Sequence, residues 1–233
     1  LDPVEKTIFL QDNWHTTITI SITYFIIVKL IQRIMQQREA FHLKWPLFAW
    51  NASLAVFSTI GFIRFSEDVF ESLIHQGTYR TFCYSVHPND VAAFWALLFA
   101  LSKLVELGDT LFVVLRKKPL IFLHYYHHAA TLIYTVHSGA ENTGSGRAFI
   151  SMNFFAHSIM YTYYACTALG IRPPNHFKNC SHIINNFRCQ QSMSNLLLAF
   201  ILYVTFAILF VKFFIETYIT RRRRKQKALD KTD

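Results

Sequence analysis

Six long apolar runs, separated by polar or basic segments, are the feature that most limits the folds open to this chain. They cover about residues 15–30, 47–63, 91–115, 120–137, 147–169 and 196–215. Runs of this length match the hydrocarbon core of a bilayer, where a single chain must form helices or a closed barrel. The 16% of charged residues is also low for an ordinary soluble domain of 233 residues. We therefore expect an all-α polytopic membrane protein, with one domain over residues 1–233 and six clear transmembrane helices.

The basic residues gather at the ends of these runs, at 29–44, 116–118 and 221–227. Cytoplasmic loops of membrane proteins carry this excess of Lys and Arg, so the pattern favours loop signals over a nucleic-acid-binding surface. We expect the loops after the first and third runs, and the basic tail 221–233, on the cytoplasmic side. The N-terminus then lies on the opposite side of the membrane.

Three connecting segments are expected outside the bilayer. Residues 1–14 are predicted to be a short exposed lead-in, and Ser66 to cap a short interfacial helix. Residues 175–195 are too polar for an ordinary span. Six crossings would therefore place the tail opposite the other basic loops, against the charge rule. A seventh crossing between residues 174 and 196 would resolve this conflict, but the sequence there supplies no apolar run.

Three histidines interrupt the fourth apolar run. His124, His127 and His128 are spaced i, i+3 and i+4, which places them on adjoining turns of one helix. Polar residues at membrane depth sometimes only bind neighbouring helices. Ionisable groups there are costly, however, and three within five residues favour a functional site.

The third run contains Lys103, Glu106 and Asp109, spaced three residues apart. An unpaired charge at the bilayer centre costs about 2.5–3.5 kcal/mol on insertion scales. These groups must therefore face one another, the histidines or a wet cavity. A pairing network without chemistry is the alternative.

The fifth run adds Asn153, His157 and Tyr161 at i, i+4 and i+8. Tyr161 and Tyr164 are candidate substrate-binding residues, although packing explains an aromatic stripe equally well. His157, with Asn153 one turn before it, is the stronger candidate for chemistry.

A basic triplet, Arg116-Lys117-Lys118, comes directly before the histidine helix. It is explained as an orientation signal, and it is also a candidate binding site for the phosphates of a large anionic substrate.

Three chemistries can use this set of residues. Membrane di-iron oxygenases carry HxxHH boxes, but the other histidines here form no second box, so no metal is expected. Proton or ion transport explains the buried carboxylates but not the basic triplet at 116–118. In acyl transfer, a neutral imidazole attacks a thioester and becomes an acyl-imidazole, while neighbouring groups fix its tautomer and move protons.

Three blocks together resemble the signature of the fatty-acid elongases, the very-long-chain 3-oxoacyl-CoA synthases of the endoplasmic reticulum. They are Lys103-Leu-Val-Glu106-Leu-Gly-Asp109-Thr110, His124-Tyr-Tyr-His127-His128 and Met152-Asn-Phe-Phe-Ala-His157-Ser-Ile-Met-Tyr161-Thr-Tyr-Tyr164. The order and spacing of the blocks match over nearly the whole chain. They look most like the branch that acts on saturated and monounsaturated chains.

The resemblance implies seven helices, six of them around a closed tunnel that holds the acyl chain. Long-chain acyl-CoA and malonyl-CoA would be the substrates, without a cofactor. His127 would carry the acyl group, and decarboxylated malonyl-CoA would attack it to give a 3-oxoacyl-CoA two carbons longer. His124 and His128 would orient His127, and His157 would lie opposite.

The resemblance also suggests roles for the remaining polar residues. Asn153 and Lys103 would stabilise developing negative charge, as oxyanion donors do elsewhere. Glu106 and Asp109 would hold Lys103 and the histidines in place. Other enzymes of the elongation cycle would share the membrane, and the chain would form a homodimer.

The chain departs from the family plan after the fifth run. Arg172-Pro-Pro leads almost directly into what resembles the family's lumenal loop, so helix six is missing. Its loss would open the tunnel on one side, and an inactive elongase-like partner or transport subunit is the alternative function. If residues 175–195 are lumenal, the resemblance implies a disulfide between Cys83 and Cys189.

Overall fold

The computed structural model describes residues 3–87, 90–171 and 192–214, and its secondary structure in these ranges is entirely helical. The helices are α1 (Pro3–Asn13), α2 (Thr16–Met35), α3 (Lys44–Cys83), α4 (Val91–Glu106), α5 (Gly108–Leu115), α6 (Phe122–Ala140), α7 (Gly146–Leu169) and α8 (Met193–Phe214). All six apolar runs therefore form helices, with α4 and α5 sharing the third run.

Four of these helical stretches are long and apolar enough to cross a membrane. They are α2, α3, the α4–α5 pair and α8. The polar residues predicted for the site lie on α6 and α7 as well as on α4 and α5, which makes α6 and α7 less apolar. The prediction of a polytopic α-helical membrane protein is confirmed.

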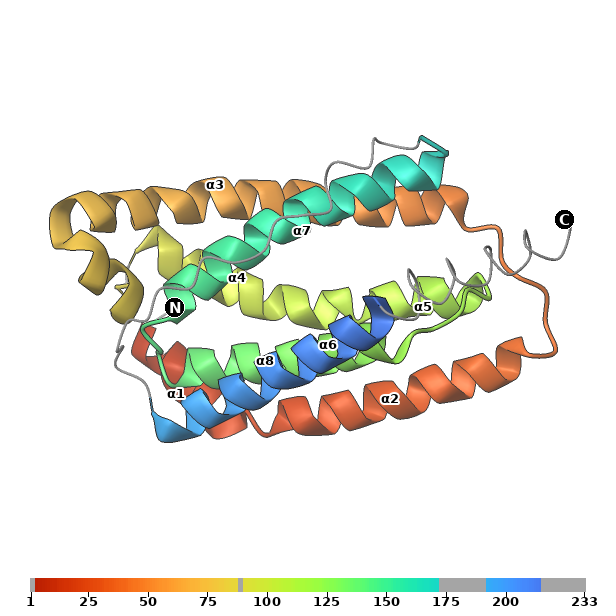
Figure 1. The fold of residues 1–233 in the computed structure, drawn as a ribbon, viewed down its shortest axis with the longest axis horizontal. Coiled ribbons are helices and arrows are strands. Elements are labelled where there is room, and N and C mark those ends of the chain that lie inside the picture. Colours follow the sequence, from red (N-terminus) through yellow and green to blue (C-terminus); the bar gives the residue numbers. More distant parts are fainter. Residues whose placement is uncertain (1–2, 88–89, 172–191, 215–233) are drawn as a thin grey trace, which may run out of the picture.

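The helices form an elongated bundle, with α3 and α7 packed along one long edge and α2 along the other (Figure 1). The α3–α7 pair is antiparallel, because Phe57 contacts Phe154 and Asp68 pairs with Arg147. The α4, α5 and α6 helices lie between these edges (Figure 1). The polar residues of the site therefore lie inside the bundle.

The end of α7 and the start of α8 lie at opposite ends of the bundle (Figure 1). Like α3 and α7, α6 and α8 are antiparallel, because Tyr126 bonds Thr205 and Ser138 bonds Asn195. Because α3 and α6 run in the same direction in Figure 1, their antiparallel partners α7 and α8 also share a direction. The expected polar loop 175–195 and the missing helix fall mostly on residues 172–191, outside the described ranges.

Both basic loops meet at one end of the bundle, as their charge predicts. Lys117 Nζ donates to the carbonyl of Arg38 at 2.9 Å, and the amide of Phe41 donates to the carbonyl of Leu115 at 3.1 Å. Helix α8 runs toward this same end (Figure 1). Six crossings were expected to leave the end of the last helix opposite the basic loops, but α8 runs toward them. The basic tail 221–233 lies outside the described residues.

The expected lead-in over residues 1–14 is mostly exposed in its described part, as predicted, but it is also helical. Pro3–Asn13 form α1, whose Gln11 side chain donates to the carbonyl of Ala140 at 2.9 Å. The next residue after this helix, Trp14, places its ring 4.9 Å from that of His137. These contacts with α6 order the segment at the end of the bundle opposite the basic loops.

The expectation of a separate short helix capped by Ser66 is also wrong. Helix α3 continues through this segment to Cys83 and turns back at Gly77, whose φ of 77° suits a residue without a side chain. Arg147 on α7 secures the extension, since its Nε lies 2.8 Å from Asp68 and a second nitrogen donates to Ser72 at 3.1 Å. This part of α3 is thus held to α7 by a charged pair and a hydrogen bond.

An aromatic layer fills the bundle between this extension and the polar residues of the site. Phe65, Phe99 and Phe154 are at most 1% exposed. Gly61 allows α7 to approach, because a Cβ there would lie 2.6 Å from the Phe154 ring. The layer therefore closes one side of the candidate site.

Candidate active site

A buried ion pair joins the third and fifth apolar runs. Lys103 Nζ lies 2.8 Å from Glu106 on α4 and donates to the Asn153 side chain on α7 at 2.9 Å. Lys103 and Glu106 are 2% and 4% exposed, so nearly all their hydration is lost. A buried charge of this kind needs close partners. The predicted pairing of Lys103 with Glu106 is confirmed, and Asn153 joins it.

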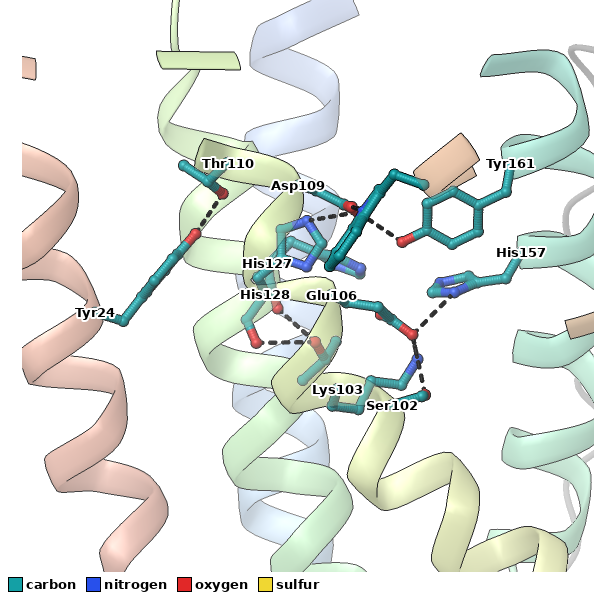
Figure 2. A network of polar contacts seen from close by, with 12 residues as sticks. Tyr24, Ser102, Lys103, Glu106, Asp109, Thr110, His127, His128, His157 and Tyr161 are labelled. Carbon is teal, nitrogen blue, oxygen red and sulfur yellow. Dashed lines mark hydrogen bonds and ion pairs between the residues drawn. The ribbon is translucent and has the colours of Figure 1, made fainter. Parts of the chain in front are cut away.

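His157 extends this network along α7. Its Nδ1 lies 3.4 Å from the Glu106 carboxylate, and the residue is 8% exposed. Ser102 donates to the same carboxylate at 3.1 Å. Glu106 thus links an amine, a hydroxyl and an imidazole, as Figure 2 shows.

Asp109 lies beyond a helix break at Leu107, on α5. Its two carboxylate oxygens accept separate hydrogen bonds, from Trp50 Nε1 and from the Tyr161 hydroxyl, each at 2.6 Å. The oxygen bound by Tyr161 is also 3.9 Å from His128 Nε2. Asp109 therefore connects α3, α5 and α7 to the histidine helix.

The three histidines of α6 form a contiguous group of rings. The His128 ring centroid is 4.7 Å from that of His124 and 5.8 Å from that of His127. On its other side, His127 packs against Phe206 of α8 at 4.8 Å. The Nε2 atom of His124 is buried and makes no hydrogen bond within the described part of the chain.

The structure therefore brings together eight predicted residues from α4, α5, α6 and α7. Figure 2 shows His127 and His128 on one side of the site and His157 on the other, with Glu106 and Asp109 between these helices. Lys103, Glu106, His128 and His157 are buried, and the other four residues are partly buried. A reaction that develops negative charge here would meet Lys103, and proton transfers would have imidazoles and carboxylates within reach.

The other predicted residues lie at the edge of this group or away from it. Tyr161 is 1% exposed and its hydroxyl is bound to Asp109, whereas Tyr164 is 45% exposed. Arg116, Lys117 and Lys118 follow α5 at the basic end, where Lys117 binds the chain at Arg38. Their contact with substrate stays a prediction.

Sequence reasoning missed Trp50 and Ser102. Trp50 lies on a different helix from every block of the motif, and its only signal was an indole N–H inside an apolar run, which needs an acceptor when buried. Ser102 stands four residues before Glu106, a helical spacing that would have predicted their contact.

The cysteines were expected to include a Cys83–Cys189 disulfide. Cys83 is disulfide-bonded and 1% exposed, and Cys166 is free. Cys189 lies outside the described residues, so the pairing stays a prediction. Among the residues that the structure describes, no group of three His, Cys, Asp or Glu side chains is arranged to hold a metal ion.

A cavity of about 150 Å³ lies on the other side of the aromatic layer from the polar network. Phe99 separates the two, because its ring faces the cavity while its centroid is 4.3 Å from Lys103 Nζ. Tyr134 and Phe149 line the cavity beside it, with their rings 5.3 Å apart. The cavity extends toward Arg147, at the end of the bundle opposite the basic loops.

Comparison with known proteins identifies the relatives of this chain. Residues 9–183 match the ELO: GNS1/SUR4 family. A Caenorhabditis elegans protein named "Putative fatty acid elongase 4" is 51% identical over 249 residues, covering 98% of this chain and 86% of that protein. Human "Very long chain fatty acid elongase 3" is 36% identical, covering 96% and 89%. "Very long chain fatty acid elongase 6" of Drosophila melanogaster is 36% identical, covering 95% and 78%.

These alignments are longer than the chain itself. They run over 249, 247 and 245 positions, against 233 residues here. They therefore include positions at which the relatives have residues and this chain has none.

Proposed function

The chain belongs to the ELO (GNS1/SUR4) family of fatty acid elongases and is a condensing enzyme, a 3-oxoacyl-CoA synthase; we propose that His127 carries the acyl chain in its reaction. The enzyme joins a long-chain acyl-CoA to malonyl-CoA, releases CO2 and yields a 3-oxoacyl-CoA extended by two carbons. The position of His127 beside His128 and opposite His157 supports the assignment.

In the first step the imidazole of His127 attacks the thioester carbonyl of the acyl-CoA. The carbon–sulfur bond breaks, an acyl-imidazole forms, and the CoA thiolate leaves with the proton that the imidazole gives up. His128, whose ring centroid is 5.8 Å from that of His127, would relay that proton, and its own partner is Asp109 at 3.9 Å. His124 packs on the far face of His128 and restricts its orientation.

In the second step malonyl-CoA loses CO2, and the electron pair of the broken carbon–carbon bond forms an enolate. The enolate attacks the acyl carbonyl, the bond to His127 breaks, and the released imidazole takes up a proton. Lys103, Asn153 and His157 form one hydrogen-bonded group with Glu106. Their donors are suited to stabilise the enolate and the tetrahedral intermediate.

The acyl chain would extend from His127 toward the cavity behind Phe99. The cavity is lined mainly by apolar side chains such as Ala96, Leu97 and Ile150. The CoA phosphates would remain at the opposite, basic end, near Arg116, Lys117 and Lys118. Tyr164, which is partly exposed on α7, would contact the substrate along this path.

The membrane arrangement follows the family plan with one change. We propose six crossings by the described helices in the endoplasmic reticulum membrane, with the basic end cytoplasmic and α1 lumenal. In the relatives, the additional positions would form one more crossing helix between α7 and α8. Such a helix is expected there because α7 and α8 run in the same direction, so the chain must return across the membrane between them. This side of the tunnel would be open here, and other enzymes of the elongation cycle or a second copy would be neighbours in the membrane.

The observation that carries the proposal is the convergence of His127, His157 and the Lys103–Glu106 pair on one buried space. Its test is condensation of acyl-CoA with radiolabelled malonyl-CoA by the purified protein. Label should enter a 3-oxoacyl product, His127→Ala should abolish this, and exposed His75→Ala on α3 should not. Unchanged product from His127→Ala would overturn the role of His127. Failure of the parent protein to form product would favour an inactive relative acting as a partner subunit.

A further inference from the structure

We infer that Trp50 is a positioning residue for the condensing reaction, which acts by orienting Asp109 toward His128. The inference rests on the proposed function of the histidine site. Trp50 lies on α3, outside the three blocks that carry the chemistry, and its indole nitrogen donates to Asp109 Oδ1 at 2.6 Å.

The geometry at Asp109 assigns a different task to each oxygen. Oδ1 is bound by Trp50, while Oδ2 is bound by Tyr161 at 2.6 Å and faces His128 Nε2 at 3.9 Å. An indole N–H can only donate, so Oδ1 must accept. Two donors from different helices thus fix the plane of the carboxylate, and the oxygen nearest His128 remains available to stabilise its protonated ring.

The contacts of the indole show why it can reach this position. A Cβ at Gly108 would lie 2.8 Å from Trp50 Cζ2, so the ring rests directly against the glycine that precedes Asp109. The indole also packs with the Phe112 ring, at 5.5 Å between ring centroids, and against the cluster of Leu54, Ala55 and Tyr161. Because Gly108 has no side chain, the indole packs directly on its backbone, close enough for Nε1 to reach Asp109 Oδ1.

Removing only the hydrogen bond separates positioning from packing. Trp50→Phe keeps an aromatic ring but loses the donor, and we expect kcat for condensation to fall on the order of tenfold with KM for acyl-CoA unchanged. Trp45→Phe, the same change on an exposed residue near the start of α3, should leave both constants unaltered. Thermal melting of the purified full chain in detergent reports whether Trp50→Phe remains folded.

A double-mutant cycle identifies the residue through which Trp50 acts. Asp109→Asn combined with Trp50→Phe should be no slower than Asp109→Asn alone, because the indole would have no further role. Gly108→Ala should displace the indole and reproduce the kcat loss of Trp50→Phe, also without a change in KM.

The inference would be overturned, with the function intact, by wild-type kcat in Trp50→Phe or by multiplied losses in the double variant. A loss of kcat that only matches the loss of folded protein would also overturn it. Absence of 3-oxoacyl product from the parent chain would instead refute the function on which it rests.

Discussion

The Glu106 carboxylate on α4 lies 3.4 Å from Nδ1 of His157 on α7, and the same oxygen atom binds Lys103 at 2.8 Å. One carboxylate thus joins a buried cation to an imidazole on the opposite wall of the site. The charge of Lys103 is compensated, and His157 is held toward the space that His127 faces from α6. In the proposed mechanism, stability and catalysis therefore depend on the same contact.

Replacing Glu106 by Gln should destabilise the protein strongly. The change leaves Lys103 charged and buried without its counter-ion, which typically costs about 3–5 kcal/mol. The measurement is the midpoint of thermal unfolding in detergent. Glu67→Gln is the matched control, because Glu67 pairs with Arg64 at 2.8 Å on an exposed surface and should contribute little. Equal midpoints for the two variants would contradict this account of Glu106.

Replacing His157 should slow the second step more than the first. If His157 assists condensation, His157→Ala should still accept an acyl group from acyl-CoA but form 3-oxoacyl-CoA about 10²-fold more slowly or worse. Rapid-quench measurement of acyl-enzyme and product separates the two steps. Loss of acyl-enzyme formation with normal condensation would assign His157 to the wrong step. His75→Ala, at an exposed position, should change neither step.

The aromatic layer should limit the length of the acyl chain. Phe99 of this layer separates site and cavity, and Phe149 packs against it at 6.1 Å between ring centroids, so Phe149→Ala should leave Phe99 room to move aside and open a path between them. We expect product distributions to shift toward chains at least one two-carbon round longer. Phe155→Ala, on the same helix but 38% exposed, is the control. Identical product lengths in the two variants would exclude the cavity as the end of the acyl site.

A close backbone contact at Gly144 should make this position intolerant of any side chain. An added Cβ would lie 1.9 Å from the carbonyl oxygen of Cys83, a residue held by a disulfide. Gly144→Ala should therefore lower the free energy of unfolding by about 1–3 kcal/mol or more. Gly146→Ala should be tolerated much better, since its nearest contact would be 3.6 Å away. Thermal unfolding of both variants, compared with the parent, tests the contact.

The parts of this structure that could be predicted from sequence are those set by distances along one helix. The apolar runs fixed the helices, and three-residue spacing predicted that Lys103 and Glu106 would pair. The spacing of His124, His127 and His128 likewise placed them on adjoining turns. These relationships depend only on helical periodicity and on the cost of unpaired polar groups in lipid.

Contacts between distant segments were beyond such reasoning. The prediction of a separate short helix capped by Ser66 failed because the contact that holds the continuation of α3 joins Asp68 to Arg147, far along the chain. The hydrogen bond from Trp50 to Asp109 likewise depends on how α3 packs on α5. No local pattern specifies either contact, since each is a property of two helices meeting in the bundle.

The central claim, that His127 carries the acyl chain, is tested most directly by intact mass spectrometry after incubation with acyl-CoA in the absence of malonyl-CoA. Rapidly quenched parent protein and His75→Ala should each gain the mass of one acyl group, and His127→Ala should gain none. Addition of malonyl-CoA should remove that mass from the parent as 3-oxoacyl-CoA forms. An acyl group of equal yield on His127→Ala would contradict the claim.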